Sequence, residues 1–163
     1  MISRVLSISK SEFIKNINSI YEQNSNSLFY KLCVVKRYDL ISYLLDYKIE
    51  YVDVNYKDNK GRNAFYMLCY NSGSTKILAN LLICHRDIII DSINIYVDGY
   101  SWFHNLCVND CYMSLKYVLN DKTCLEYIKS LDITNTMYEI CRKNNIDILK
   151  LLLCYNICDI NIL

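Results

Sequence analysis

The sequence of 163 residues contains no proline and only three glycines, and this scarcity excludes one class of nucleotide site at the outset. Gly61, Gly73 and Gly99 stand too far apart to build the glycine-rich loop that cradles phosphates. We expect Gly61 and Gly99 to occupy turns that need a positive φ, which glycine adopts without steric cost. Gly73 lies in a polar stretch that predicts a loop between two helices.

Long apolar runs and an excess of charge of either sign are also missing. No apolar run approaches the roughly 18–20 residues that span a bilayer, so we expect no membrane-spanning helix. The formal net charge is +1, which predicts neither a nucleic-acid partner nor a membrane-surface partner. Residues 1–10 lack a signal-peptide pattern, and nine cysteines cannot all pair. We therefore expect reduced thiols in the cytoplasm, with the nucleus as the alternative.

One cysteine pattern recurs four times in a chain that is 53% hydrophobic and therefore able to build a continuous core. In each copy a bulky apolar residue precedes a Leu-Cys or Ile-Cys pair, and the cysteines are 36, 38 and 34 residues apart (69−33, 107−69 and 141−107). Free cysteine packs as a small hydrophobe, so we expect these residues to line one inner row. We call them the cysteine column: Cys33, Cys69, Cys107 and Cys141, preceded by Leu32, Leu68, Leu106 and Ile140, and four residues earlier by Phe29, Phe65, Phe103 and Met137.

Residues 53–82 contain the clearest copy of the repeated unit. A turn at residues 59–61 precedes a predicted apolar helix over Ala64–Tyr70 and a second helix over residues 75–83. A turn followed by two helices in about 33 residues is one unit of a stacked repeat. The corresponding helices are expected near residues 28–33 and 39–45, 101–107 and 114–119, and 135–141 and 146–153.

The pattern Ser9-Lys10-Ser11-Glu12 fits a capping box, in which the serine side chain takes a backbone N–H at the start of a helix. We therefore expect residues 1–24 to form an N-terminal capping helix. Four repeats would follow over residues 25–57, 58–95, 96–130 and 131–163.

The repeated unit resembles the ankyrin repeat over roughly residues 25–163. The resemblance lies in Asp58 and Gly61-Arg62-Asn63-Ala64-Phe65-Tyr66, in residues 144–153, and in the closing Asp-Val-Asn and Asp-Ile-Asn of residues 53–55 and 159–161. It implies an all-α fold, an ankyrin-repeat solenoid of about four helix-turn-helix units. The family's proline is absent and cysteine replaces its second alanine. A degenerate array of this kind most resembles the ankyrin proteins of poxviruses and related large DNA viruses.

By this resemblance the chain is expected to be a non-catalytic protein–protein interaction module without a cofactor. A viral member would bind a host protein in the host cytoplasm, as a mimic of the ankyrin inhibitors of NF-κB or as a host-range factor. The alternative is an adaptor or self-associating subunit that acts through the exposed face of its C-terminal repeat. Many such viral proteins carry an F-box-like segment that recruits ubiquitin ligase; we expect none here, because the sequence stops at Leu163, soon after the fourth unit.

The family's partner surface comes from the turn tips and the exposed positions of the first helices. Aromatic residues and arginine beside polar groups are typical of binding hot spots, although any single one of them is more often a solvated turn residue. The predicted partner-binding residues are Tyr56, Lys57, Asn59, Lys60, Arg62, Tyr70, Tyr96, Tyr100, Asn109 and Arg142, within a wider surface that adds Lys31, Val34, Val35, Met67, Asn71, Asn105, Val108, Glu139 and Lys143. The turn cluster Tyr56, Lys57, Lys60 and Arg62 is the strongest candidate.

Three groups of residues could in principle bind a metal ion or catalyse a reaction, and each also has an explanation in packing or turn structure. His104, Cys107 and Cys111 have a spacing that could hold zinc or a Cys–His nucleophile, but Cys107 belongs to the cysteine column and His104 occupies the family's signature histidine, which bonds backbone between repeats. We expect no metal and no catalysis there. The Asp and Asn of residues 53–55 are expected to bond nearby backbone rather than calcium.

The last repeat has no following unit to cover it. Terminal repeats usually present a polar outer face, but here apolar residues recur on both predicted helices. We expect a face formed by Met137, Ile140, Ile148 and Leu152 to be partly exposed and to serve as a site for a partner or a second copy.

Overall fold

A computed structural model describes residues 8–24, 27–71, 74–84, 95–97 and 99–158. The described chain is mostly helical, as the sequence predicts, with one pair of antiparallel strands that the sequence analysis did not foresee. The elements are α2 (Lys10–Asn24), α3 (Leu28–Val34), α4 (Tyr38–Tyr47), the 3-10 helix η2 (Ile49–Tyr51), α5 (Ala64–Tyr70), α6 (Thr75–Cys84), β1 (Tyr96–Val97), β2 (Tyr100–Ser101), α8 (Trp102–Val108), α9 (Tyr112–Asn120), α10 (Lys122–Lys129), α11 (Thr134–Arg142) and α12 (Ile146–Cys154).

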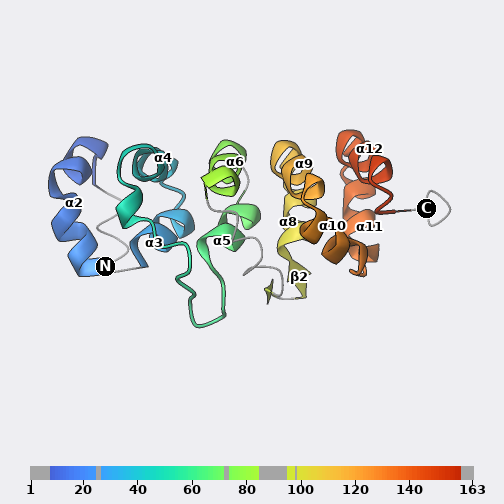
Figure 1. The fold of residues 1–163 in the computed structure, drawn as a ribbon, viewed down its shortest axis with the longest axis horizontal. Helices are drawn as coiled ribbons and strands as arrows, with labels where there is room; N and C mark the ends of the chain where they lie inside the picture. The colour runs from blue at the N-terminus through green and yellow to red at the C-terminus, as the bar shows by residue number, and fades with distance from the viewer. Residues whose placement is uncertain (1–7, 25–26, 72–73, 85–94, 98, 159–163) are drawn as a thin grey trace.

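The helices form two parallel rows (Figure 1). In the first row α3, α5, α8 and α11 pack one on the next, and in the second row α4, α6, α9 and α12 do the same. Helix α2 covers α3 and α4 at the N-terminal end. Most of these helices have only seven to ten residues and would be marginal alone, so the packing between the rows stabilises them. Within the described residues, none of the helices is both long enough and apolar enough to cross a bilayer.

The cysteine column occupies one register, but its last member is not buried. Each of the four cysteines is the second-to-last residue of α3, α5, α8 or α11. Cys33, Cys69 and Cys107 are buried, whereas Cys141 is exposed. The expectation of four inner cysteines is therefore wrong at Cys141, because α11 ends the first row in the described chain and its outer side lacks the neighbour that covers the other three.

Side-chain caps begin helices in place of the proline that the ankyrin pattern would supply. Helix α5 has the predicted bounds, and the Asn63 side chain accepts a hydrogen bond from the Tyr66 N–H at 2.9 Å. Ser101 accepts from the His104 N–H at 3.2 Å at the start of α8. Ser9 likewise accepts from the Glu12 N–H at 3.2 Å, as the capping box predicts. Such caps satisfy backbone donors that the first helical turn leaves open.

The turn between the two helices of a unit is repeated in detail. The residue three positions after the cysteine has a left-handed backbone in three units: Lys36, Asp110 and Asn144, with φ of 59°, 57° and 54°. The next N–H then donates to the carbonyl before the cysteine, with N–O distances of 3.0–3.1 Å, as in Arg37 to Leu32. In the second unit the Ser74 hydroxyl donates to the Leu68 carbonyl at 2.6 Å instead. Either arrangement satisfies a carbonyl at the end of the first helix.

The glycine and closing-turn predictions are also settled where the chain is described. Gly61 and Gly99 have φ of 77° and 81°, so the prediction of positive φ is confirmed, and Gly73 lies outside the described residues. The Asp53 carboxylate accepts from the Asn55 N–H at 2.9 Å, which is the predicted backbone-fixing role. Residues 159–161 lie outside the described chain.

Asparagine side chains join successive helices of the first row by hydrogen bonds. Asn71 donates its amide to the Cys33 carbonyl at 3.0 Å, and Asn109 donates to the Cys69 and Tyr70 carbonyls at 2.7 and 3.0 Å. Both stand two residues after a column cysteine. The last carbonyls of a helix have no partner within it, so each bond satisfies the preceding unit and fixes the register of the stack.

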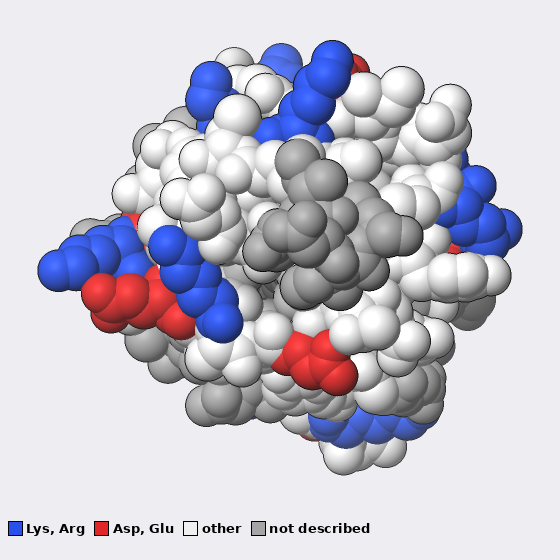
Figure 2. All heavy atoms as spheres, turned by 90° about the vertical axis from the view of Figure 1, so that its right-hand side faces the viewer, with Lys and Arg blue, Asp and Glu red and all other residues white. Residues whose placement is uncertain are grey.

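The apolar face predicted at the C-terminal end is buried rather than exposed. Met137, Ile140, Ile148 and Leu152 all lie in the core, because α11 packs on α8 and α12 packs on α9. The earlier expectation for these four residues is therefore wrong. At this end of the molecule the charged side chains of the described residues, of both signs, are scattered over a mostly uncharged surface (Figure 2).

Candidate functional site

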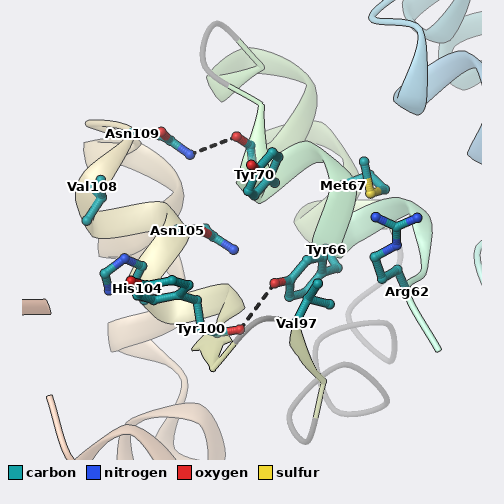
Figure 3. A pocket seen from close by; sticks show the side chains of 10 residues that line it. All are labelled: Arg62, Tyr66, Met67, Tyr70, Val97, Tyr100, His104, Asn105, Val108 and Asn109. Carbon is teal, nitrogen blue, oxygen red and sulfur yellow. Dashed lines mark hydrogen bonds between the residues drawn. The ribbon is translucent and has the colours of Figure 1, made fainter. Parts of the chain in front are cut away.

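A groove of about 470 Å³ lies where α5, α8 and the β1–β2 hairpin meet (Figure 3). Two consecutive units of the first row contribute to it. Its lining residues are Arg62, Tyr66, Met67, Tyr70, Val97, Tyr100, His104, Asn105, Val108 and Asn109. Four of the predicted partner-binding residues therefore converge on one site: Arg62, Tyr70, Tyr100 and Asn109.

Aromatic rings dominate the groove. Tyr66 is buried, and its hydroxyl donates to the Tyr100 carbonyl at 3.1 Å, which joins α5 to β2 (Figure 3). The Tyr100 ring stacks on His104 with 4.4 Å between ring centroids. Tyr70 and Tyr100 are 61% and 45% exposed, so both remain accessible at the rim, Tyr100 on the side that His104 does not cover. Exposed tyrosines on a rigid frame are typical of protein-binding surfaces.

Asn105 supplies the least expected feature of the groove. The residue is only 6% exposed, and its Nδ2 has no hydrogen-bond partner among the described residues. In Figure 3 its amide lies between Tyr66 and Tyr70, on the side of α8 that faces α5. A buried polar donor is almost always paired in a native protein, so this one calls for an explanation.

The edge of the groove is held by an ion pair. Asp58 accepts from the Arg62 guanidinium at 2.7 Å, from the Tyr30 hydroxyl at 2.7 Å, and from the backbone N–H groups of Lys60 and Arg62 at 2.9 Å. Burial alone would raise the pKa of Asp58, but the hydrogen bonds from Arg62, Tyr30 and the two amides outweigh it and lower the pKa to about 2. The carboxylate is thus charged throughout the physiological range and locks the turn before α5.

His104 joins two units of the first row. Its Nδ1 lies 3.0 Å from the Thr136 hydroxyl oxygen on α11. Burial lowers the pKa of His104; the Glu139 carboxylate opposes this effect and the Lys143 ammonium adds to it, so the ring is neutral at pH 7. The family role predicted a bond to backbone between repeats; the bond does cross to the next unit, but its partner is a side chain.

The residues of the zinc alternative lie in the packed part of the chain. Cys107 and Cys111 are buried, and burial raises the pKa of Cys107 well above its usual value. Among the described residues, no three His, Cys, Asp or Glu side chains are grouped in a way that could hold a metal ion.

The remaining predicted residues lie outside the groove. Lys57, Asn59 and Lys60 are exposed on the turn before α5. Tyr56 packs its ring on Tyr30 at 5.2 Å, and Tyr96 places its hydroxyl oxygen 3.2 Å from that of Tyr127. Arg142 pairs with Glu139 at 2.8 Å at the far end of the row.

Sequence reasoning did not assign Tyr66, Val97 or His104 to the partner surface, although all three line the groove. For Tyr66 and His104 the sequence contained a pattern that could have indicated this position. The residue three positions before each column cysteine carries an aromatic ring in every unit: Tyr30, Tyr66, His104 and Tyr138. Val97 is placed by a two-residue strand, which is too short to leave a periodic signal.

No protein-family model matches this sequence, and comparisons with the curated proteins and with the solved structures find no match either.

Proposed function

We propose that this chain is an ankyrin-type repeat protein whose function is to bind another protein, without catalysis. The observation that carries the proposal is the groove between α5 and α8, where two stacked units present tyrosine faces, Asn105 and Arg62 together. The two rows of short helices with turns at one side support the ankyrin interpretation. Stacked repeats leave extended surfaces of this kind for partners.

The proposed partner is a host protein, and the proposed setting is the host cytoplasm. This part of the proposal depends on the resemblance to the degenerate viral ankyrin proteins described above. A partner that modulates host signalling would need a moderately sized, specific surface rather than a deep catalytic cleft. The groove offers aromatic faces and hydrogen-bond donors, and its one imidazole is neutral and bonded to Thr136.

A Lys57→Glu, Lys60→Glu variant is expected to reduce capture of the partner at least fivefold without lowering the melting temperature. Both lysines are exposed on the turn beside the groove, and reversing rim charges weakens association while leaving the core intact. Arg62 is left unchanged because its ion pair with Asp58 holds the turn. The measurement is quantitative affinity capture from host-cell lysate, followed by mass spectrometry.

The matched control reverses Lys76 and Lys150, which are exposed on α6 and α12 in the second row. Capture by this control is expected to equal that by the wild type. Equal loss in both variants would mean that net charge, and not the groove, governs binding. Unchanged capture by the Lys57, Lys60 variant would remove the turn from the proposed surface.

A second candidate function is self-association through the C-terminal end. Cys141 is exposed at the position where the other column cysteines are covered by a neighbouring helix, and Tyr138 and Ile146 are also exposed there. A second copy would cover this end as a further unit would. The light-scattering mass distinguishes the two candidates: 19.3 kDa supports a monomer that acts through its groove, and twice that mass supports self-association.

A further inference from the structure

The unpaired amide of Asn105 points to the chemistry of the bound partner. Among the described residues, Trp102 Nε1 and Asn105 Nδ2 are buried donors without an acceptor, and of the two only Asn105 lines the groove. A buried donor without an acceptor destabilises the free protein, and native structures contain few of them. The same position, two residues before the column cysteine, carries Lys31, Met67 and Glu139 in the other units, so the stack does not require an amide there. A hydrogen-bond acceptor supplied by a partner would explain why the groove contains an amide at this position.

The surroundings of Asn105 restrict what else the partner presents. Tyr66, Tyr70 and Met67 provide an apolar wall on α5, opposite the amide on α8 (Figure 3). An aliphatic side chain fits such a wall. Lys57 and Lys60 stand exposed on the turn that leads into the groove, and the charge of Arg62 is already balanced by Asp58. The net charge at this edge of the groove is therefore positive, and it complements an acidic residue of the partner.

Building on the proposed function, we propose that the groove binds an extended peptide segment of the partner. A main-chain carbonyl of that segment accepts a hydrogen bond from Asn105 Nδ2, its aliphatic side chain packs on Tyr66 and Met67, and an acidic residue beside it faces Lys57 and Lys60. Nδ2 is shielded from solvent in the free protein. Admission of the carbonyl requires a rotamer change of Tyr70, which lies beside the amide and is 61% exposed; exposed side chains make such changes within nanoseconds.

An extended segment is favoured over a helix for two reasons. The carbonyls within a helix already accept backbone hydrogen bonds, whereas those of an extended chain are available to the amide of Asn105. The axes of packed helices typically lie about 8–10 Å apart, which is the length of about three extended residues at about 3.3 Å each. One tripeptide therefore reaches from Asn105 on α8, which binds its carbonyl, to α5, where its aliphatic side chain packs, and the acidic residue lies beside it on the side of the turn that carries Lys57 and Lys60.

The test begins with a phage-displayed library of random dodecapeptides selected on the full-length protein. Enriched peptides are expected to share an aliphatic residue with an acidic residue within three positions, and no recurring basic residue. Enrichment of basic peptides, or no enrichment over an uncoated surface, would overturn the proposal. Neither result would affect the proposed function, since the lysate capture described above would still detect a partner that binds in another way.

The decisive variant is Asn105→Leu, which keeps the shape of the side chain and removes the donor. Fluorescence polarisation with a selected peptide is expected to give an affinity at least tenfold weaker, and the melting temperature of the free variant is expected to be equal to or higher than that of the wild type. Asn80→Leu on α6, in the second row, is the control and should bind as the wild type does. Wild-type affinity in Asn105→Leu, or a lower melting temperature, would show that Asn105 has a structural role and contradict the proposal.

Discussion

Replacing Cys69 with lysine is expected to destabilise the protein by roughly 4 kcal/mol or more, which is enough to unfold many domains of this size. Cys69 is fully buried in α5, and burial raises the pKa of its thiol well above the usual value, with the neighbouring Cys111 adding to the effect. The same environment penalises an ammonium, whose pKa falls by about 3–5 units at buried sites, at about 1.4 kcal/mol for each unit. Urea denaturation followed by circular dichroism measures the loss.

The repeat itself provides the control for this variant. Cys141 occupies the same position in α11 but is exposed, so Cys141→Lys is expected to change the free energy of unfolding by less than about 0.5 kcal/mol. A lysine near the end of a helix also interacts favourably with the helix dipole. Equal destabilisation of the two variants would contradict the register that places only the first three cysteines against a neighbouring helix.

Replacing Asp58 with asparagine is expected to cost about 2 kcal/mol at pH 7, and this difference is expected to vanish in acid. The pKa of Asp58 is about 2 in the folded protein, against an ordinary value of 3.8. A carboxyl whose pKa is lowered by folding stabilises the protein above its ordinary pKa, and this contribution is lost as the pH falls from about 4 to about 2. A pKa lowered from 3.8 to about 2 corresponds to about 2 kcal/mol of stability.

Urea denaturation of the wild type and of Asp58→Asn at several pH values between 2 and 7 measures this contribution. The difference between the two proteins isolates Asp58 from the other carboxyls, and the exposed Asp46→Asn in α4 serves as the control. A difference that stays constant from pH 7 to pH 2 would mean that the Tyr30–Asp58–Arg62 cluster is not held by the charge of the carboxylate.

The parts of the fold that follow from local rules were predictable from the sequence. The bounds of α5 were predicted to the residue, and α6 extends only one residue beyond its prediction, because apolar spacing and a capping residue define such helices. The inner position of Cys33, Cys69 and Cys107 followed from the recurrence of one residue type at one spacing. The ankyrin identity itself stays a prediction.

The parts that depend on packing between units were not predictable. Helix α10 was missed although Cys124, Leu125 and Ile128 follow a helical spacing, because it comes after the two helices that the repeat pattern predicts for the third unit. The burial of Ile140 and Ile148 depends on which side of α11 and α12 faces the preceding unit, and spacing alone does not specify that side. The ion pair that fixes Arg62 was likewise invisible, so the sequence overstated its availability to a partner.

The candidate groove was predicted only as a broad surface. Exposed positions of first helices and turns gave ten residues, and the structure gathers Arg62, Tyr70, Tyr100 and Asn109 while leaving the others apart. Asn105 belonged to the wider predicted surface, but its missing hydrogen-bond partner is a property of the folded protein. No spacing rule specifies whether a particular amide finds an acceptor.

Thiol labelling of the unmodified native protein tests the stacked arrangement most directly. An alkylating reagent applied for increasing times, with each cysteine followed by peptide mass spectrometry, reports how well each thiol is covered. We predict that Cys141 reacts as fast as an unstructured thiol, while Cys33, Cys69 and Cys107 react at least about 100-fold more slowly, because opening a buried site costs several kcal/mol. Equal rates at all four cysteines would contradict the account. In a stack, the next helix covers this position in every unit except the last, so the thiol of Cys141 must be more accessible than the other three.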